Sequence, residues 1–253
     1  STNKKILSVF HDSEDTNYKY EQRYDYQIID LPNIKNINAI LYFTEALESE
    51  NEVIFYFINR SRNIQKKIST KVDNYSEINI QELNNDNLND ITFIIANILN
   101  KKSKRFINVF YTIGDMLCDN VHAQCLEDFS FFNLKPDTIT KSFQGLKWMH
   151  FPNQNNFQSY LTIINTDKLK MNFKLRVIFD DFNEHSIMYT QNYDTNQRGI
   201  IEINLNKLFL KEGLSLDKRG IIQLECRNYN PSANLFSYDL KEQTISVDHL
   251  TGG

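Results

Sequence analysis

A repeated pattern of polar turns and alternating residues constrains the fold of this chain most. Residues 196–208 begin with a polar turn and continue as a stretch in which apolar and polar residues alternate. Residues 74–83 in the first half show a similar pattern. A period of two places the apolar side chains on one face of an extended strand. The similar segments therefore predict two related, β-rich halves.

The similarity extends to further apolar segments that occur in the same order in both halves. The two halves are offset by roughly 121 to 129 residues, about half the chain, and such self-similarity is typical of duplicated domains. Any two β-rich halves can be aligned loosely, which is the alternative interpretation. The matched segments are 53–58 with 174–179, 91–96 with 220–225, 107–111 with 235–238, and 121–122 with 247–249.

Composition favours sheets over helices. The chain of 253 residues is 41% hydrophobic and 24% charged, which is normal for globular proteins. It contains 18 Phe and 13 Tyr against 7 Gly and 4 Pro, and aromatic residues suit a half-buried pleated surface. We expect an all-β fold of two tandem β-sandwich domains at 1–123 and 157–253. Immunoglobulin-like and jelly-roll topologies both remain open.

Two shorter segments give expectations for local structure. Residues 76–83 alternate and predict a strand. Leu205, Leu208 and Phe209 have helical spacing, so residues 205–213 predict a short helical turn between strands.

Residues 124–156 lie mostly outside the repeated pattern, and we expect them to form an apolar segment that connects the domains. Leu146, Met149 and Phe151 flank the single tryptophan, Trp148, whereas exposed linkers are polar. This predicts that Trp148 is buried between the halves. If Trp148 is instead exposed next to His150, the pair becomes a candidate platform for stacking on a sugar.

Aromatic side chains near the N-terminus give a second candidate binding surface. Tyr24 and Tyr26 alternate with a polar residue, so an extended strand places both rings on one face. Such a face can stack on sugar rings or bases. The alternative is a sheet face that packs against the neighbouring domain.

Two histidines are weak candidates for metal ligands. His122 and His249 end matching strands of the two halves, and each has an aspartate close by. A cupin-like centre would need several His on neighbouring strands, and no His-x-His motif occurs. Cys118 and Cys125 flank His122, but a fourth zinc ligand is missing. We therefore predict no metal and no cofactor.

Charge and hydropathy exclude several classes of partner. The net charge of −4 and the pI near 5.8 argue against nucleic acid as a partner. The basic run at 101–105 fits a solvated hairpin tip. No segment reaches the roughly 18 apolar residues of a membrane span, so we expect a soluble chain. The odd count of 3 Cys mildly favours a reducing compartment. Because the first residue is Ser1 and not Met, removal of a leader before Ser1 stays open, and the sequence assigns no localisation.

The function expected from the sequence is non-catalytic. No GxGxxG, GxxxxGK[ST], GxSxG or HExxH motif occurs. The main hypothesis is a binding or assembly module that engages carbohydrate or protein through aromatic loop residues. One alternative is a metal-dependent, cupin-like enzyme that acts on a sugar or small acid. A second is a coat or surface-layer subunit, which would assemble as a homo-oligomer.

Overall fold

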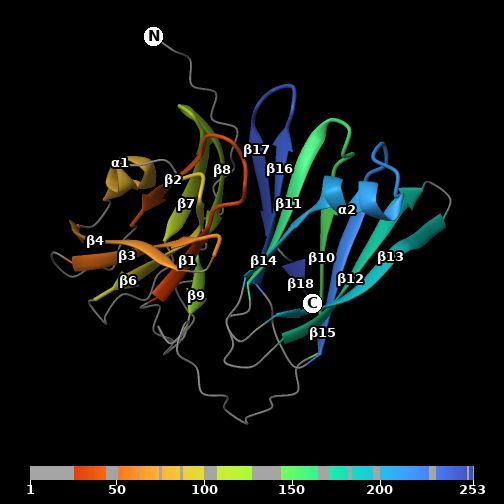
Figure 1. Ribbon diagram of the computed structural model, residues 1–253, viewed down its shortest axis with the longest axis horizontal. Helices are drawn as coiled ribbons and strands as arrows, with labels where there is room; N and C mark the ends of the chain where they lie inside the picture. Colours follow the sequence, from red (N-terminus) through yellow and green to blue (C-terminus); the bar gives the residue numbers. More distant parts are fainter. Residues whose placement is uncertain are drawn as a thin grey trace, which may run out of the picture. The chain divides into compact units, whose positions relative to one another are not determined.

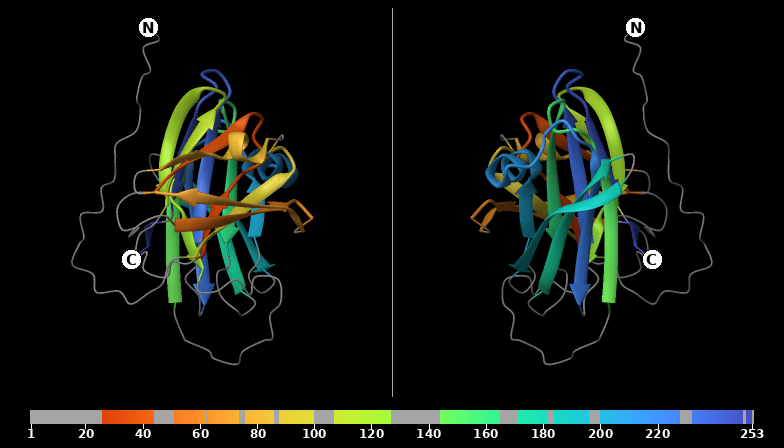
Figure 2. Two further views of the ribbon diagram at one scale, coloured as in Figure 1. Left: turned by 90° about the vertical axis from the view of Figure 1, so that its left-hand side faces the viewer. Right: turned by 90° about the vertical axis from the view of Figure 1, so that its right-hand side faces the viewer.

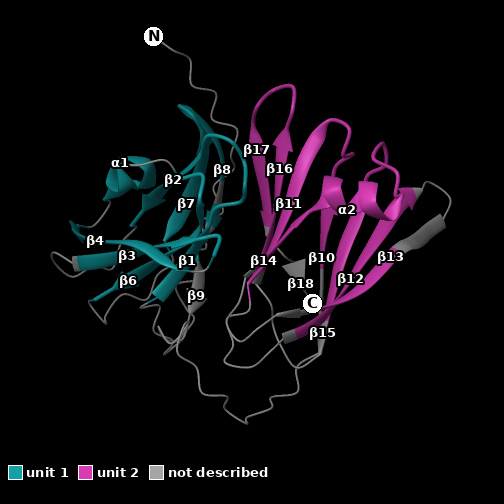
Figure 3. Ribbon diagram, in the orientation of Figure 1, with its two compact units in different colours: residues 1–129 teal, residues 130–253 magenta. Residues whose placement is uncertain are grey.

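The chain forms two compact units, Ser1–Phe129 and Ser130–Gly253 (Figure 3). Each unit is considered by itself below. The computed structural model describes residues 26–43, 51–61, 63–73, 76–85, 88–99, 107–126, 144–164, 171–181, 184–195, 200–227, 232–249 and 251–252.

The first unit contains two antiparallel sheets (Figure 1). One sheet has the strand order β4-β3-β6-β1-β9, and the other has the order β5-β2-β7-β8. In the left panel of Figure 2 the orange strands β3 and β4 face the reader. The strands are β1 (Tyr26–Asp30), β2 (Ile37–Tyr42), β3 (Asn51–Asn59), β4 (Ile64–Val72), β5 (Glu77–Asn79), β6 (Ile91–Ile98), β7 (Asn108–Ile113), β8 (Met116–His122) and β9 (Gln124–Leu126).

The second unit has the same arrangement of strands. Its sheets have the orders β13-β12-β15-β10-β18 and β14-β11-β16-β17, which match those of the first unit position by position. In the right panel of Figure 2 the teal to cyan strands β12 and β13 face the reader. The strands are β10 (Gln144–Phe151), β11 (Phe157–Ile164), β12 (Met171–Asp181), β13 (Glu184–Thr195), β14 (Ile200–Asn204), β15 (Gly220–Arg227), β16 (Ser232–Asp239), β17 (Ile245–His249) and β18 (Thr251–Gly252).

Helices are few and short. In the described residues they are α1 (Ile80–Asn84), of 5 residues, and α2 (Leu205–Glu212), of 8 residues. The predicted all-β class with tandem sandwiches is thus confirmed. In an immunoglobulin constant domain the first two strands belong to one sheet. Here the first two strands of each unit belong to different sheets, because β1 pairs with β6 and β2 with β7, and β10 pairs with β15 and β11 with β16. Neither unit therefore has the immunoglobulin constant pattern.

Both helices begin at an asparagine that follows a short strand. The side-chain oxygen of Asn79 accepts hydrogen bonds from the backbone N–H of Gln81 and Glu82, and Asn204 accepts one from Lys207. The helical turn predicted over 205–213 is confirmed. The strand predicted over 76–83 ends at Asn79 and becomes α1, because the cap at Asn79 competes with continued pairing.

Alternate residues of the strands fill the core of the second unit. β12 contributes Phe173, Leu175, Val177 and Phe179, all at most 2% exposed. The helix α2 adds Phe209, whose ring makes edge-to-face contacts with Phe151 and Phe179 at centroid distances of 5.5 and 5.9 Å. The two sheets and α2 therefore share one core, as in a sandwich.

A buried polar contact links the two sheets of the first unit. The hydroxyl of Tyr111 on β7 donates to the backbone oxygen of Asp30 on β1 at 2.9 Å and lies 3.2 Å from its carboxylate. Burial, and then the charge of Asp30, raise the pKa of Tyr111 well above its usual value. The tyrosine therefore stays neutral and keeps its donor for this contact.

The predicted connecting segment at 124–156 differs from the structure. Gln144–Phe151 is β10, which pairs with β15 along its whole length and belongs to the second unit. Gln124–Leu126 is β9 and pairs with β1. Two of the apolar residues near Trp148, Met149 and Phe151, are therefore explained by the inner face of a strand.

Gly220 gives a test of the packing between β10, β15 and β12. A Cβ at this position would lie 2.1 Å from the backbone oxygen of Ile178 and 2.9 Å from the Phe179 Cα, both on the neighbouring backbone. Gly220→Ala should lower the free energy of unfolding by at least about 2 kcal/mol. Urea denaturation monitored by circular dichroism measures this loss.

The control for this variant is Gly114→Ala. Gly114 has a φ of 55° and nothing within 4 Å of an added Cβ, so only the left-handed backbone is strained, which costs about 1 to 2 kcal/mol. A Gly220→Ala protein as stable as wild type would contradict the packing described for β15.

Candidate functional site

Trp148 and His150 lie side by side on the outer face of β10. Met149 and Phe151 point to the core and are 1% and 2% exposed, whereas Trp148 is 42% exposed and His150 is also exposed. The two outward rings meet edge to face at a centroid distance of 5.4 Å. The prediction that Trp148 is buried is wrong, because the alternation of β10 gives the inner positions to its neighbours.

Trp148 belongs to a row of paired residues that continues onto β15 and β12. Its register partner is Gln223 on β15, and the partner of Gln223 is Arg176 on β12. Directly paired residues of an antiparallel sheet share a face, and strands lie about 4.8 Å apart. The row therefore places an indole, an amide and a guanidinium within roughly 10 Å of one another along one surface.

Hydrogen bonds and ion pairs hold the guanidinium of Arg176 in place. Its Nη1 donates to Oε1 of Gln223 at 2.8 Å, and its Nη2 contacts Oε2 of Glu225. The Nζ of Lys174 lies 3.7 Å from the same carboxylate oxygen. The side chains of Arg176 and Glu225 are 21% and 16% exposed, so solvent screens their attraction less than that of a surface pair. Arginine therefore has one defined orientation here.

We call this surface the Trp148 face and define it by Trp148, His150, Gln223, Arg176, Glu225 and Lys174. It combines an exposed aromatic ring with donors and acceptors that are hydrogen-bonded to one another. The four polar side chains on β12 and β15 are half-buried, although they lie on the outer face and not in the core.

A β-bulge allows the two units to be compared at single residues. The pairing of β3 with β4 shifts between Phe57 and Ile58, and the pairing of β12 with β13 shifts between Val177 and Ile178. When these shifts are aligned, Tyr56 of the first unit corresponds to Arg176 of the second. The sheet partners then place Ile95 at the position of Gln223 and Ile28 at that of Trp148.

The equivalent row of the first unit has a different chemistry. Ile28 and Ile95 are fully buried, and Tyr56 is half-buried with the Nζ of Lys67 over its ring at 5.5 Å. Two apolar residues therefore occupy the positions of the exposed indole and the amide. The Trp148 face is a property of the second unit and does not follow from the shared fold.

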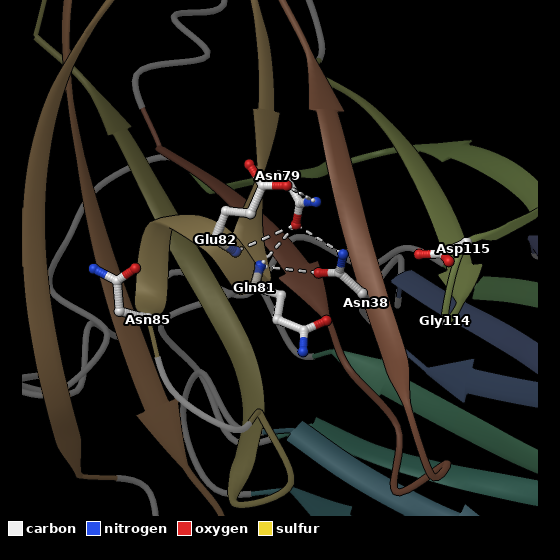
Figure 4. Close-up of a pocket in the computed structure, with 7 residues that line it drawn as sticks. All are labelled: Asn38, Asn79, Gln81, Glu82, Asn85, Gly114 and Asp115. Carbon is white, nitrogen blue, oxygen red and sulfur yellow. Dashed lines mark hydrogen bonds between the residues drawn. The ribbon is translucent and has the colours of Figure 1, made fainter.

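The first unit has a polar pocket at the start of α1 (Figure 4). Asn38 on β2 donates to the Asn79 side chain at 2.8 Å and accepts from the backbone of Gln81 at 3.0 Å. These amides satisfy one another and the first turn of α1, so their arrangement is explained by helix capping. The pocket is lined by Asn38, Asn79, Gln81, Glu82, Asn85, Gly114 and Asp115.

Of the other predicted site residues, the structure describes the side chain of Tyr26. Tyr26 is half-buried on β1 of the first unit, and Tyr24 lies outside the described residues. His122 and His249 end β8 and β17 as expected, but their side chains also lie outside the description. Within the described part of the chain, no three His, Cys, Asp or Glu side chains gather as metal ligands. The metal hypothesis stays a prediction without support.

The sequence reasoning missed Gln223, Arg176, Glu225 and Lys174. The signal that could have found them is the alternation of polar with apolar residues in β12 and β15, which marks one face as outward. What alternation alone does not give is the register that places these residues beside Trp148.

Comparisons with known proteins leave the family unassigned. No family model matches the chain, and no curated protein matches it. A solved structure, the serine-rich repeat protein Srr2 from Streptococcus agalactiae, aligns with 11% identity over 89% of this chain and 83% of that one. Its TM-score of 0.23 is too low to support any inference. Among the described helices, none is long and apolar enough to cross a membrane.

Tryptophan fluorescence tests the exposure of the site. Trp148 is the only tryptophan, so emission excited at the indole band reports this residue alone. Since the ring is 42% exposed, we expect red-shifted emission that iodide quenches substantially. The reference is free tryptophan in the same buffer. Blue-shifted emission that iodide leaves unchanged would show that Trp148 is covered in solution.

Proposed function

We propose that the chain is a non-catalytic carbohydrate-binding module and that its ligand lies on the Trp148 face. The observation that carries this proposal is the exposed indole of Trp148 in register with Gln223 and the fixed guanidinium of Arg176. A sugar ring has an apolar face of C–H groups and a rim of hydroxyls. The indole of Trp148 offers an apolar surface for the C–H groups, and Gln223 and Arg176 offer hydrogen-bonding groups for the hydroxyls.

The aromatic part supplies the non-specific share of the binding energy. A fully buried Trp side chain removes about 150 to 250 Å² from water. A sugar stacked on the exposed part of Trp148 covers only a fraction of that area, so the contribution at about 25 cal/mol per Å² is a few kcal/mol at most. We therefore expect weak binding by a single site.

The polar part supplies orientation. Sugar hydroxyls donate and accept, and the face contains an amide, a guanidinium and a carboxylate, which together do both. Gln223 and Glu225 already receive hydrogen bonds from Arg176, so their side chains are ordered before a ligand arrives. Ordered side chains lose less entropy on binding.

Carbohydrate fits this surface better than a protein partner does. The centre of a protein interface is depleted in charged residues, whereas Arg176, Glu225 and Lys174 lie beside the indole here. We also propose that the chain arose as a tandem repeat. Support comes from the matching strand orders and the matching bulges of the two units, with only the second unit carrying the Trp148 face.

A glycan array probed with wild-type protein and with Trp148→Ala tests the function. We expect a set of glycans that wild type retains and the variant loses, with at least a tenfold loss of affinity, about 1.4 kcal/mol. Trp148→Phe should keep part of the binding, because it keeps an aromatic ring. Isothermal titration with the retained glycans gives the affinities.

The matched control is Leu210→Ala, which removes an apolar side chain that is 67% exposed on α2. This variant should bind like wild type. Glycan binding that Trp148→Ala leaves unchanged, or retention of proteins but of no glycan, would refute the proposed function.

A further inference from the structure

The charges around Trp148 are unequal in number. On the outer face of β12 and β15 lie the cations Lys174 and Arg176, and both approach one carboxylate, that of Glu225. Further along β12, Asp180 lies 3.7 Å from Arg219 and is balanced by it. Counting the described Lys, Arg, Asp and Glu side chains, this surface has a charge of +1, whereas the whole chain has a charge of −4.

We infer that the Trp148 face binds an anionic saccharide, one whose ring stacks on Trp148 while its acidic group lies over Lys174 and Arg176. This inference rests on the proposed function and names the ligand class for the same site. The shared chemistry is a carboxylate or sulfate on a sugar ring. Carboxylates and sulfates are bound best by the guanidinium of arginine and the ammonium of lysine.

The geometry gives each cation a different part in this recognition. Arg176 uses Nη1 and Nη2 for Gln223 and Glu225, but a guanidinium has five N–H donors, so it keeps further donors for a ligand. Lys174 lies 3.7 Å from Glu225 and its side chain is 36% exposed, so its ammonium can turn toward a second anion. One carboxylate cannot neutralise both cations.

The spacing of Trp148 and Arg176 sets the size of a ligand that can reach both. Trp148 and Arg176 are two strands apart through Gln223, which is about 10 Å. This is near the distance over which exposed charges act at physiological ionic strength, about 8 Å. An acidic group attached to a sugar on the indole therefore lies within the field of the two cations.

The equivalent positions of the first unit contain no such combination. Tyr56 stands where Arg176 does, and Ile54, one outward position before it, stands where Lys174 does. The first unit shares the fold and the bulge, yet its outer face lacks the two cations of β12. The charge on the Trp148 face is therefore not a consequence of the fold.

The test uses the full chain on an array that carries neutral, uronate-bearing, sialate-bearing and sulfated oligosaccharides at equal density. We expect acidic members to be retained preferentially and the retained set to depend on Trp148. Binding to them should weaken as sodium chloride is raised, because salt screens the two cations. The relative signals of the three acidic groups show which anion the face prefers.

Single variants separate the charge from the fold. Lys174→Gln should weaken binding of the acidic glycans about three- to fivefold and leave any neutral glycan unaffected. Glu225→Gln should strengthen binding of acidic glycans, since the amide oxygen still accepts a hydrogen bond from Arg176 while the competing negative charge is removed. Arg176→Gln should weaken binding of acidic glycans. If Arg176→Gln fails to fold, Lys174→Gln still tests the inference, because Lys174 is more exposed. Lys241→Gln, which removes a lysine that is 88% exposed on the β16–β17 turn, is the control.

The outcomes separate the two levels of the proposal. Binding that needs Trp148 but is equally strong for neutral and acidic glycans, at low and high salt, overturns the anionic ligand and leaves the carbohydrate function in place. An array with no glycan that depends on Trp148 overturns both. Acid-selective binding that is weakened about three- to fivefold in Lys174→Gln and unchanged in Lys241→Gln supports both.

Discussion

The burial of every second side chain in β12 is the constraint on which the Trp148 face depends. In β12, Phe173, Leu175, Val177 and Phe179 enter the core, so the residues between them must face outward. Such a strand supports two independent selections, one for packing and one for the outer surface. A face built on the outward positions of β12 does not weaken the core of the second unit. In the first unit the equivalent positions Ile28 and Ile95 are buried, so the two units differ there in packing as well as in chemistry.

The pairing register adds a second constraint, because it fixes which residues share a row. A shift of one residue would turn the opposite face of a strand outward. The pairings of β10 with β15 and of β15 with β12 have no shift, and they place Arg176 in register with Gln223 and Trp148. The bulges at Phe57 and Val177 lie on the other side of β3 and β12 and show which rows of the two units correspond. The shared geometry and the different chemistry are thus separate facts about the chain.

The sequence predicted the class of fold and the helical turn at α2, because both depend on local periodicity. It did not predict α1, since the cap at Asn79 is a contest between a side-chain hydrogen bond and strand pairing. The misplacement of Trp148 has a similar cause. Apolar neighbours indicate burial of a segment, but only the pairing of β10 shows that Met149 and Phe151 take the inner positions. Long-range register also determines the neighbours of Trp148, and local patterns do not encode it.

The Arg176 and Glu225 pair is best understood through the cost of binding. A partly buried ion pair adds little net stability, because desolvation offsets the attraction between its charges. Its use here is positional: the carboxylate and the amide of Gln223 hold a flexible side chain in one orientation. A ligand that meets an ordered guanidinium does not have to order it, and saves about 0.5 to 1.5 kcal/mol of side-chain entropy. For a site that uses one indole and a few polar groups, that saving is comparable to one hydrogen bond. On the proposed function, the ion pair therefore contributes more to recognition than to folding.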